Sequence, residues 1–349
     1  MEADMRLKKT VALRKCVGLL GASTLALASF GAHADKNRPV IGFAIYGMPS
    51  WVAWGKQGAE KVAAANNVDL LWVSANMDVN TQISQIQQFI NRKVDLIIVG
   101  AVNSATLAPQ FEAAKKAGVP VVGVNMAIRA PSDALLASYV GPDDVGAGAQ
   151  VANQVITKLG GKGNVVILQG PIGQSAEVDR TAGIKQALAK APGIKVLAWQ
   201  PGKWDRTLSY NVTQDWLSRF GSQVNGIIAE NDDMAIGAVQ ALKAKGLEGK
   251  IVVAGIDGIK DGMREVQAGT MVGTSLQNAA LEMGEAVQVS VDYLQGRPYP
   301  RKALLHMIPV DKANVAGYYD QLYTNPGAFL DRLSDLVKAN LKSGDLTAQ

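Results

Sequence analysis

The feature that most limits the fold of this chain is a regular alternation of short apolar runs with longer helical patterns, which starts at Pro39. The short runs predict buried strands, and the longer stretches between them have the apolar spacing of helices. Strands separated by helices in this way lie parallel and are joined by right-handed crossovers. The first half of the alternation predicts strands over 40–45, 69–73, 95–99, 119–124 and 138–140, with helices over 52–66, 79–91 and 106–117.

The same order then starts again, which indicates an internal repeat. The second half predicts strands near 165–168, 195–198, 226–229, 251–254 and 272–274. Segments also match in sequence between the halves: 78–90 matches 205–217, 94–99 matches 224–229, and 113–118 matches 241–246. In each half the last match is followed by a strand that ends in a polar residue, Asn125 or Asp257. We therefore predict an α/β protein with two similar doubly wound lobes, each built on a parallel sheet.

The residues after one strand point to a ligand site. The apolar run 226–229 is followed by Glu230-Asn231-Asp232-Asp233, and a helical pattern continues from Met234. Asp232 or Asp233 is suited to cap that helix. Polar groups at the carboxyl end of a parallel strand lie where small ligands bind in open α/β sheets. Two such edges facing each other would form a cleft that closes around a ligand about a hinge.

The end of the repeat predicts that the chain crosses between the lobes several times. A helix over 279–294 and a strand over 304–308 have no partner if the second lobe is already complete. A return of the chain to the first lobe near Gln277 and a second crossing near His306 would account for both the helix and the strand. The expected lobes are 39–141 with 278–305, and 142–277 with 306–317. Residues 318–349 form a C-terminal extension, whose amphipathic helix over 330–341 is expected to dock on the lobes.

The amino end has the three parts of a secretory signal peptide. Basic residues precede the apolar run 17–30, and Ala32-His33-Ala34 has the small-residue pattern of a cleavage site. A membrane anchor is the alternative, but the run is shorter than the ~18 residues that a spanning helix needs. We expect residues 1–34 to be removed during export to the periplasm. The rest of the chain then carries 30 basic and 28 acidic side chains, so its charge gives no reason to expect a nucleic-acid partner.

Catalytic and cofactor signatures are missing from the sequence. The only cysteine is Cys16, and His306 is the one histidine after residue 34, so a catalytic triad, a zinc site or a disulfide is not expected. Gly146-Ala-Gly148 partly matches a dinucleotide-binding loop, but Val151 stands where the third glycine belongs. Close packing between helices explains these glycines better. We expect no enzymatic activity, no cofactor and no metal.

Four motifs in order resemble a known family. They are Ala229-Glu-Asn-Asp-Asp-Met-Ala-Ile-Gly-Ala, Gly255-Ile-Asp-Gly, Leu168-Gln-Gly-Pro-Ile-Gly-Gln-Ser-Ala and Pro309-Val-Asp-Lys-Ala-Asn-Val. Over residues 39–315 the chain resembles the periplasmic sugar-binding proteins of ABC importers, of the ribose-binding type. The resemblance implies a type I periplasmic binding fold. It also implies a monomer that hands a small-molecule ligand to an inner-membrane ABC permease.

The resemblance also implies a set of ligand-binding residues. Asn231, Asp257 and Gln277 correspond to residues that take sugar hydroxyls, Arg180 to the family's arginine and Trp204 to its stacking ring. Carboxylate, amide and guanidinium groups together suit hydroxyls, each of which both donates and accepts. Trp51 and Trp204 could hold the apolar face of a sugar ring between them. Tyr46 and Asn125 complete the expected set from the first lobe.

Structural roles compete with these assignments. Asn231 and Asp257 could cap turns, Arg180 could be a solvated helix residue, and Trp204 could pack on the surface. Trp72, Trp199 and Trp216 are expected in the core, and Trp54 fits either role.

The first lobe departs from the family pattern. The family often has an Asn-Pro-Phe-Phe-like run where this chain has Tyr46-Gly-Met-Pro-Ser-Trp51, and Asp-Arg where it has Asn125-Met126. Gly100 stands in place of an expected asparagine. A less hydroxylated or partly apolar ligand therefore remains an alternative to a sugar. A sensory protein that presents such a ligand to a membrane receptor is the alternative function.

Overall fold

A computed structural model describes residues 38–103 and 105–344. The predicted signal peptide and its cleavage site after Ala34 lie outside these residues. Among the residues described, no helix has both the length and the apolar character needed to cross a membrane.

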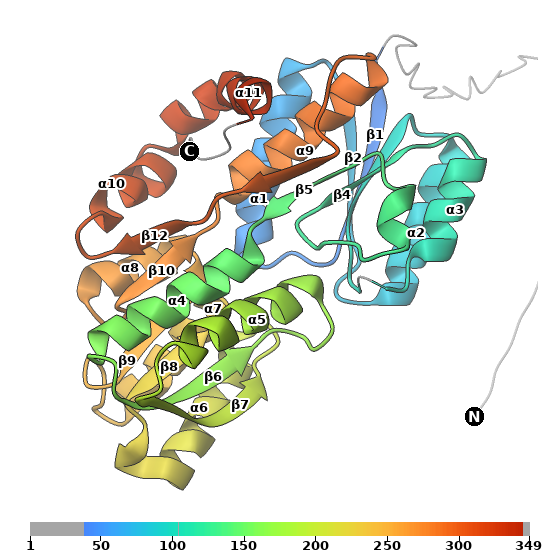
Figure 1. Cartoon of the computed structure of the whole chain (residues 1–349). Coiled ribbons are helices and arrows are strands. Elements are labelled where there is room, and N and C mark those ends of the chain that lie inside the picture. The colour runs from blue at the N-terminus through green and yellow to red at the C-terminus, as the bar shows by residue number, and fades with distance from the viewer. Residues whose placement is uncertain (1–37, 104, 345–349) are drawn as a thin grey trace, which may run out of the picture. The chain divides into compact units, whose positions relative to one another are not determined.

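The first lobe is built on a six-stranded, fully parallel sheet (Figure 1). Its strands lie in the order β11-β5-β4-β3-β1-β2. Their bounds are β1 Val40–Ile45, β2 Asp69–Ser74, β3 Leu96–Gly100, β4 Val121–Val124, β5 Ser138–Pro142 and β11 Lys302–Leu305. The strands β3, β4 and β5 are buried along their whole length, as their apolar runs predict.

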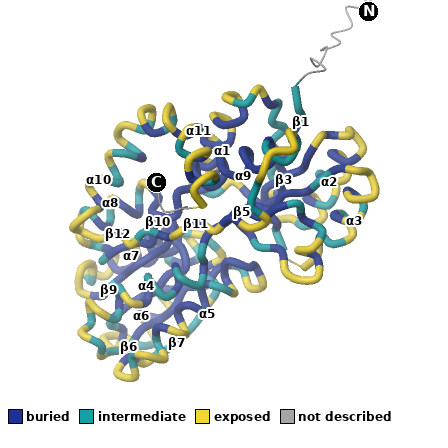
Figure 2. Tube along the Cα trace, turned by 45° about the horizontal axis from the view of Figure 1, so that its top comes forward, coloured by how far each residue is buried: buried dark blue, intermediate teal, exposed yellow. Residues whose placement is uncertain are grey.

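The second lobe has a matching sheet in the order β12-β10-β9-β8-β6-β7. Its strands are β6 Gly163–Gln169, β7 Ile194–Pro201, β8 Gly226–Ala229, β9 Val252–Asp257, β10 Gly273–Leu276 and β12 Ile308–Asp311. All neighbours are parallel except β12, which pairs antiparallel with β10. Figure 2 shows the central strands of both sheets largely buried, the edge strands β2, β7, β11 and β12 only partly buried, and many outer turns exposed.

The strand orders confirm the internal repeat. Counted from the start of each lobe, the first five strands of both sheets lie in the order 2-1-3-4-5. The matched segments occupy equivalent places, since β3 and β8 are both third strands. Asp78 and Asp205 begin equivalent helices, and each side chain accepts a hydrogen bond from the backbone N–H three residues later.

Helices cover both faces of each sheet. The principal helices are α1 Ser50–Ala65, α2 Val79–Arg92, α3 Ala108–Lys116, α4 Asp144–Lys158, α5 Ser175–Ala189, α6 Arg206–Phe220, α7 Asp232–Ala244, α8 Lys260–Ala268 and α9 Ala279–Leu294. Short 3-10 turns lie at η1 Ser132–Leu135 and η2 Gly221–Gln223. The pairs in contact are α1 with α9, α2 with α3, α4 with α5 and α6 with α7. In Figure 1, α1 and α9 lie on one face of the first sheet, and α2 and α3 on the other.

The chain crosses between the two sheets three times, and this confirms the expected multi-crossing connection. It leaves the first sheet after β5, returns after β10 through α9 to β11, and leaves again to β12. The single strand predicted over 304–308 is wrong. Two strands, β11 and β12, stand there in different sheets, and His306-Met307 connects them. Apolar residues continue through the connection, so their pattern did not reveal the break.

The C-terminal extension packs on the lobes through α10 Val315–Tyr319, η3 Asp320–Thr324 and α11 Pro326–Ser343. The helix α11 contacts α1 and α9, with Phe329, Leu333 and Val337 buried in the contact. The α10 helix contacts α8 in the second lobe. The predicted docking of α11 on the lobes is confirmed. Trp54, whose role the sequence did not decide, packs against Phe329 of α11, with 6.3 Å between the ring centroids.

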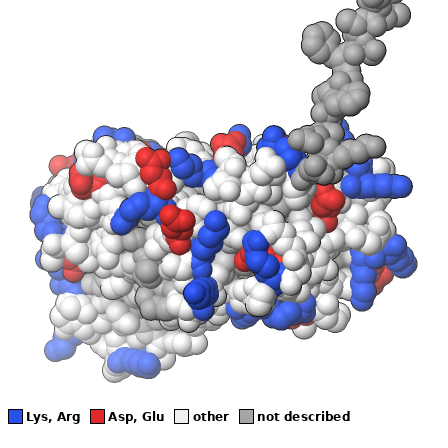
Figure 3. Space-filling model, turned by 90° about the horizontal axis from the view of Figure 1, so that it is seen from above, with Lys and Arg blue, Asp and Glu red and all other residues white. Residues whose placement is uncertain are grey.

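Charges of both signs are interspersed over the face shown in Figure 3. Lys and Arg side chains lie among Asp, Glu and uncharged residues there, and neither sign forms a continuous field across this face.

One buried carboxyl group lies between α9 and α11. Glu285 is fully buried, and its Oε1 accepts a hydrogen bond from Asn340 Nδ2 at 3.2 Å. Its Oε2 has no hydrogen-bond partner among the described residues. Burial raises the pKa of Glu285 to about 8. The folded protein therefore holds a proton that the unfolded chain releases above pH 4.5.

We predict that Glu285→Gln removes a loss of stability at alkaline pH. Between pH 4.5 and about 8, the folded state binds this proton more strongly than the unfolded state does. The free energy of unfolding therefore falls as pH rises through this window, by at most ~1.4 kcal/mol per pH unit. The amide that replaces the carboxyl group cannot titrate. Thermal unfolding at pH 5 and pH 8.5 should show the variant close to wild type at pH 5 and clearly more stable at pH 8.5.

Glu248→Gln is the matched control, because Glu248 is exposed. It should show little of this pH-dependent gain. A stability difference between Glu285→Gln and wild type that stays constant with pH would contradict the analysis.

Candidate functional site

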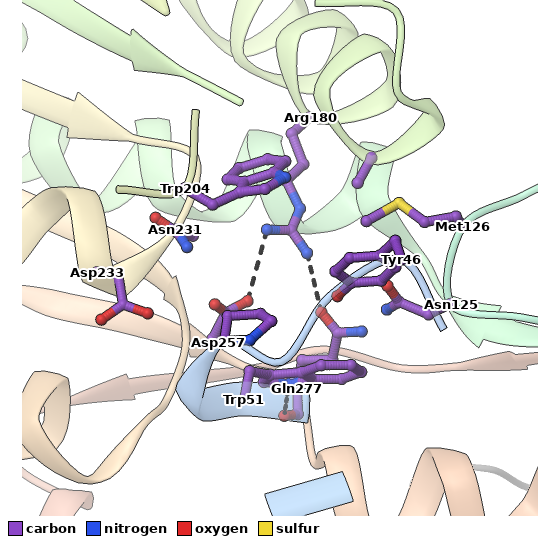
Figure 4. A pocket seen from close by; sticks show the side chains of 12 residues that line it. Tyr46, Trp51, Asn125, Met126, Arg180, Trp204, Asn231, Asp233, Asp257 and Gln277 are labelled. Atoms are coloured by element: carbon purple, nitrogen blue, oxygen red, sulfur yellow. Dashed lines mark hydrogen bonds and ion pairs between the residues drawn. The ribbon is translucent and has the colours of Figure 1, made fainter. Parts of the chain in front are cut away.

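A cavity lies between the carboxyl ends of the two sheets, and its lining comes from both lobes (Figure 4). All eight predicted site residues line it: Tyr46, Trp51, Asn125, Arg180, Trp204, Asn231, Asp257 and Gln277. Pro49, Met126, Ala176 and Asp233 complete the lining. Most of these residues sit at, or within a few residues of, the end of a strand, where a parallel sheet presents polar groups.

The first lobe supplies three of the predicted residues. Tyr46 follows β1, Asn125 follows β4, and Trp51 stands in the first turn of α1. The Trp51 indole Nε1–H donates to the backbone carbonyl of Gln277 at 2.9 Å, which ties the ring to the crossover after β10. The hydroxyl of Tyr139 donates to the backbone carbonyl of Asn125 at 2.7 Å and holds that residue in place.

Asn231 both caps a helix and lines the cavity. The structure contradicts the prediction that Asp232 or Asp233 caps the helix, because α7 already begins at Asp232. The Asn231 side chain accepts a hydrogen bond from the Met234 N–H at 2.9 Å. Asp232 has another role, accepting from the Ile259 N–H at 3.0 Å and from the Thr274 hydroxyl at 2.8 Å. It thereby ties α7 to the segment after β9 and to β10.

Arg180 is the centre of the polar network. Arg180 is 4% exposed, so it is not a solvated helix residue. Nε donates to Asp144 at 2.8 Å, and one terminal nitrogen donates to the backbone carbonyl of Glu230 at 2.6 Å and lies 3.5 Å from Asp257. The other terminal nitrogen donates to the Gln277 side-chain oxygen at 2.9 Å. The planar guanidinium is therefore fixed in one orientation.

Close packing of α4 on α5 positions this arginine. A Cβ atom on Gly148 would lie 2.1 Å from the backbone oxygen of Arg180, and one on Gly183 would lie 2.0 Å from that of Val145. These distances leave no room for a side chain, so the glycines let the two helices touch. Gly148 therefore confirms the helix-packing interpretation, whereas Gly146 leaves room for the side chain of Asp143, which caps α4.

Asp257 is the cavity's main buried acid. Burial raises its pKa to about 7, although the neighbouring Arg180 charge acts in the opposite direction. Asp144, behind Arg180, also has its pKa raised by burial, again against the effect of Arg180. One buried cation thus faces several carboxyl groups, and the cavity holds groups that can both donate and accept hydrogen bonds.

Three of the lining residues have strained backbones. Asn125 and Trp204 both have φ of 60°, and Asp257 has φ of 119°. Positive φ is uncommon for residues other than glycine and is concentrated at functional sites, where the fold holds the side chain in a required direction.

The two tryptophans bound the polar cluster on different sides. In Figure 4, Trp204 lies above Asp257 and Gln277, and Trp51 lies below. The Trp204 ring lies 5.5 Å from the Arg180 guanidinium carbon, and its Nε1–H donates to Gln174 Oε1 at 2.7 Å. The other tryptophans differ: Trp216 is buried in the core, while Trp72 and Trp199 are partly buried against the core clusters.

Direct bonds join the lobes around the cavity. Ser50 Oγ donates to Asp233 Oδ2 at 3.0 Å, and Gln174 Nε2 donates to the Val102 carbonyl at 3.0 Å. Arg129 pairs with Asp179 at 2.6 Å. In the structure the two edges therefore touch each other around the cavity.

Several residues that shape the site escaped the sequence reasoning. Met126 had been noted as a departure from the family pattern and Asp233 as a possible helix cap, but neither was expected among the ligand-binding residues. Asp144, Glu230 and Glu282 form a second layer that does not line the cavity. Glu282 could have been noticed, because it is charged and stands in the otherwise largely apolar segment 279–291.

Comparisons with known proteins agree with this geometry. A family model described as a periplasmic binding protein domain matches residues 41–298. The chain is 43% identical over 336 residues to a xylitol-binding protein of Mycolicibacterium smegmatis, covering 96% of this chain and 94% of that protein. It is 28% identical over 299 residues to a ribose import binding protein of Haemophilus influenzae, covering 86% of this chain and 98% of that protein.

Solved structures match over similar lengths. An ABC transporter periplasmic solute binding protein from Actinobacillus succinogenes with bound D-allose superimposes with a TM-score of 0.77 and 31% identity. The match covers 80% of this chain and all of that one. It confirms the expected type I periplasmic binding fold, and together with the family model it shows that the chain belongs to the periplasmic binding protein family.

Proposed function

We propose that this protein captures a sugar or polyol in the cavity and delivers it to the membrane permease of an ABC importer. The observation that carries the proposal is the convergence of the eight predicted side chains on one cavity between two lobes. Import is preferred to a sensory role because a relative matched along most of its length is named as an import protein.

The donor and acceptor groups suit a polyhydroxylated ligand. A hydroxyl group donates one hydrogen bond and accepts others, so it needs both kinds of partner. Asp257 would accept from ligand hydroxyls, while the Asn231 amide could donate and Arg180 would hold Asp257 in place. Bonds to charged groups contribute roughly 1.5–3 kcal/mol each. The faces of Trp51 and Trp204 would cover the C–H surfaces of the ligand.

Several further parts belong to the same proposal. The lobes are 39–141 with 278–305 and 142–277 with 306–317, and 318–349 is an extension. Residues 1–34 are removed in the periplasm, and the mature protein acts as a monomer. Ligand capture needs affinity and no chemical step, so we propose no enzymatic activity.

The test of this function is isothermal titration of the protein lacking residues 1–34 with xylitol, D-ribose, D-allose and myo-inositol. At least one should bind with one molecule per monomer and micromolar or tighter affinity, which corresponds to about −8 kcal/mol. Binding should also shift tryptophan fluorescence, because Trp51 and Trp204 line the cavity. Failure of all four to bind would contradict the proposal.

Asp257→Asn should weaken ligand binding about tenfold or more. The substitution keeps the size of the side chain, removes its charge and replaces one acceptor oxygen with a donor. Titration of the ligand that binds wild type most tightly measures the effect. Asp331→Asn is the control. The Asp331 carboxylate is exposed and pairs with Lys61, and neither residue lines the cavity. Equal ligand affinity of Asp257→Asn and wild type would show that Asp257 does not contribute to ligand binding.

Trp204→Leu should weaken binding roughly threefold to tenfold, because the apolar face that covers the ligand is lost. Trp199→Leu is the matched control: Trp199 lies on β7 beneath Lys185 and does not line the cavity. If both variants lose the same affinity, the loss reflects altered packing of the lobe and Trp204 is not a contact residue.

A further inference from the structure

Glu282 lies behind the cavity wall and holds two of its side chains. It is fully buried in the first turn of α9 and does not line the cavity. Its Oε2 accepts a hydrogen bond from Gln277 Nε2 at 2.7 Å, and its Oε1 accepts one from Asn125 Nδ2 at 3.1 Å. An ionised carboxylate only accepts hydrogen bonds, so both amides must turn their NH2 groups toward Glu282.

The orientation of Gln277 is fixed from both ends. Its Oε1 accepts from the Arg180 guanidinium at 2.9 Å while its Nε2 donates to Glu282. A guanidinium only donates, so this amide cannot turn over without placing two donors against each other.

Asn125 is fixed from one end only. Its Nδ2 donates to Glu282, and its backbone is held by the Val140 carbonyl and the Tyr139 hydroxyl. Its Oδ1 is buried and has no hydrogen-bond partner among the described residues, although Asn125 lines the cavity. A buried acceptor left without a partner is destabilising, because it has lost its hydrogen bonds to water. A donor on a bound ligand would satisfy it.

We propose that Glu282 in its ionised form is a specificity-determining positioning residue: by accepting from Asn125 Nδ2 it presents Asn125 Oδ1 to the ligand, so the cavity then requires a hydroxyl donor at that point. This inference rests on the proposed function, because it names one contact within the same site. It gives a role to a buried acid that lies behind a polar wall in the first turn of α9.

The arrangement predicts what Glu282→Gln does. The new side chain has one acceptor oxygen and one donor NH2 group. Gln277 must still donate, since Arg180 fixes it, so it takes the acceptor oxygen. The NH2 group of the new residue then faces Asn125, which must turn over to accept from it. Asn125 would present its own NH2 group to the ligand, and the contact would change from acceptor to donor.

The experiment compares the parent ligand with its monodeoxyfluoro analogues. The parent is whichever of xylitol, D-ribose, D-allose and myo-inositol binds wild type most tightly. Fluorine accepts a hydrogen bond weakly and donates none, so it cannot satisfy Asn125 Oδ1. Titrations are run at pH 9, because burial raises the pKa of Glu282 to about 8 and the carboxyl group must be ionised.

In wild type, fluorine at the one carbon whose hydroxyl faces Asn125 should weaken binding about tenfold or more, because Asn125 Oδ1 loses its donor. In Glu282→Gln the penalty at that same carbon should shrink at least fivefold, while the penalties at the other carbons stay unchanged. Unchanged penalties at every carbon would overturn the inference and leave the proposed function intact. Failure of all four parent ligands to bind wild type would overturn both.

Glu285→Gln is the matched control. It makes the same change in the same helix, but Glu285 contacts Asn340 of α11 and not the site. Its fluorine penalties should equal those of wild type at every carbon, and a shift equal to that of Glu282→Gln would overturn the inference.

If Glu282→Gln fails to fold, wild type at pH 6 replaces it, because a protonated Glu282 has one donor and one acceptor as well. The titratable groups that face Glu282 are Asp144, Glu285, Tyr46 and Tyr139. Asp257 in the cavity also titrates in this range. These titrations change the affinity of the parent and of the analogue fluorinated at the carbon facing Asn125 alike, so the ratio of these two affinities isolates the contact. An unchanged ratio between pH 6 and pH 9 would overturn the inference.

Discussion

The buried guanidinium of Arg180 is the interaction on which the rest of the site depends. It is held by Asp144 from α4, by the backbone after β8, by Asp257 at the end of β9 and by Gln277 after β10. Removing one partner of a buried charge is costly, because the other charge then stays in the interior uncompensated. Arg180 therefore connects the ends of three strands of the second lobe and fixes the relative positions of their polar side chains.

The network extends from the second lobe into the first. Gln277 links Arg180 to Glu282, and Glu282 links to Asn125 at the end of β4. Gln277 stands at a crossing between the lobes, and its backbone carbonyl accepts from Trp51. A chain of hydrogen bonds thus runs through the connection and reaches both walls of the cavity. Hydrogen bonds at each of these links make a polar site rigid, which reduces the entropy lost when a ligand binds. Of the side-chain groups in this chain of bonds, only Asn125 Oδ1, at its end, stays without a partner within the described residues.

The sequence allowed the architecture to be predicted more fully than the site. Alternating apolar runs and the repeat of 78–90 in 205–217 are local patterns, and both sheets follow them. Most of the eight cavity residues could be identified because they stand close to strand ends, where position alone brings side chains together. Arg180 lies within α5 and was identified through the resemblance of its motif to the family.

What could not be predicted depends on contacts between distant parts of the chain. Asn231 caps α7 in place of the neighbouring aspartates, because all three residues suit a cap and only the backbone decides among them. Residues 304–305 belong to the first sheet and Ile308 to the second, although the segment was predicted as one strand. Asp144 and Glu282 act through Arg180, Gln277 and Asn125, and no spacing in the sequence relates them.

A crystal structure of the mature protein soaked with its tightest-binding polyol tests the central claim most directly. The account predicts one ligand in the cavity between the lobes, with its hydroxyl groups within about 3.2 Å of Asp257 and Asn231 and its C–H surface against Trp51 or Trp204. A ligand bound elsewhere, or one in the cavity without a contact to Asp257, would contradict it.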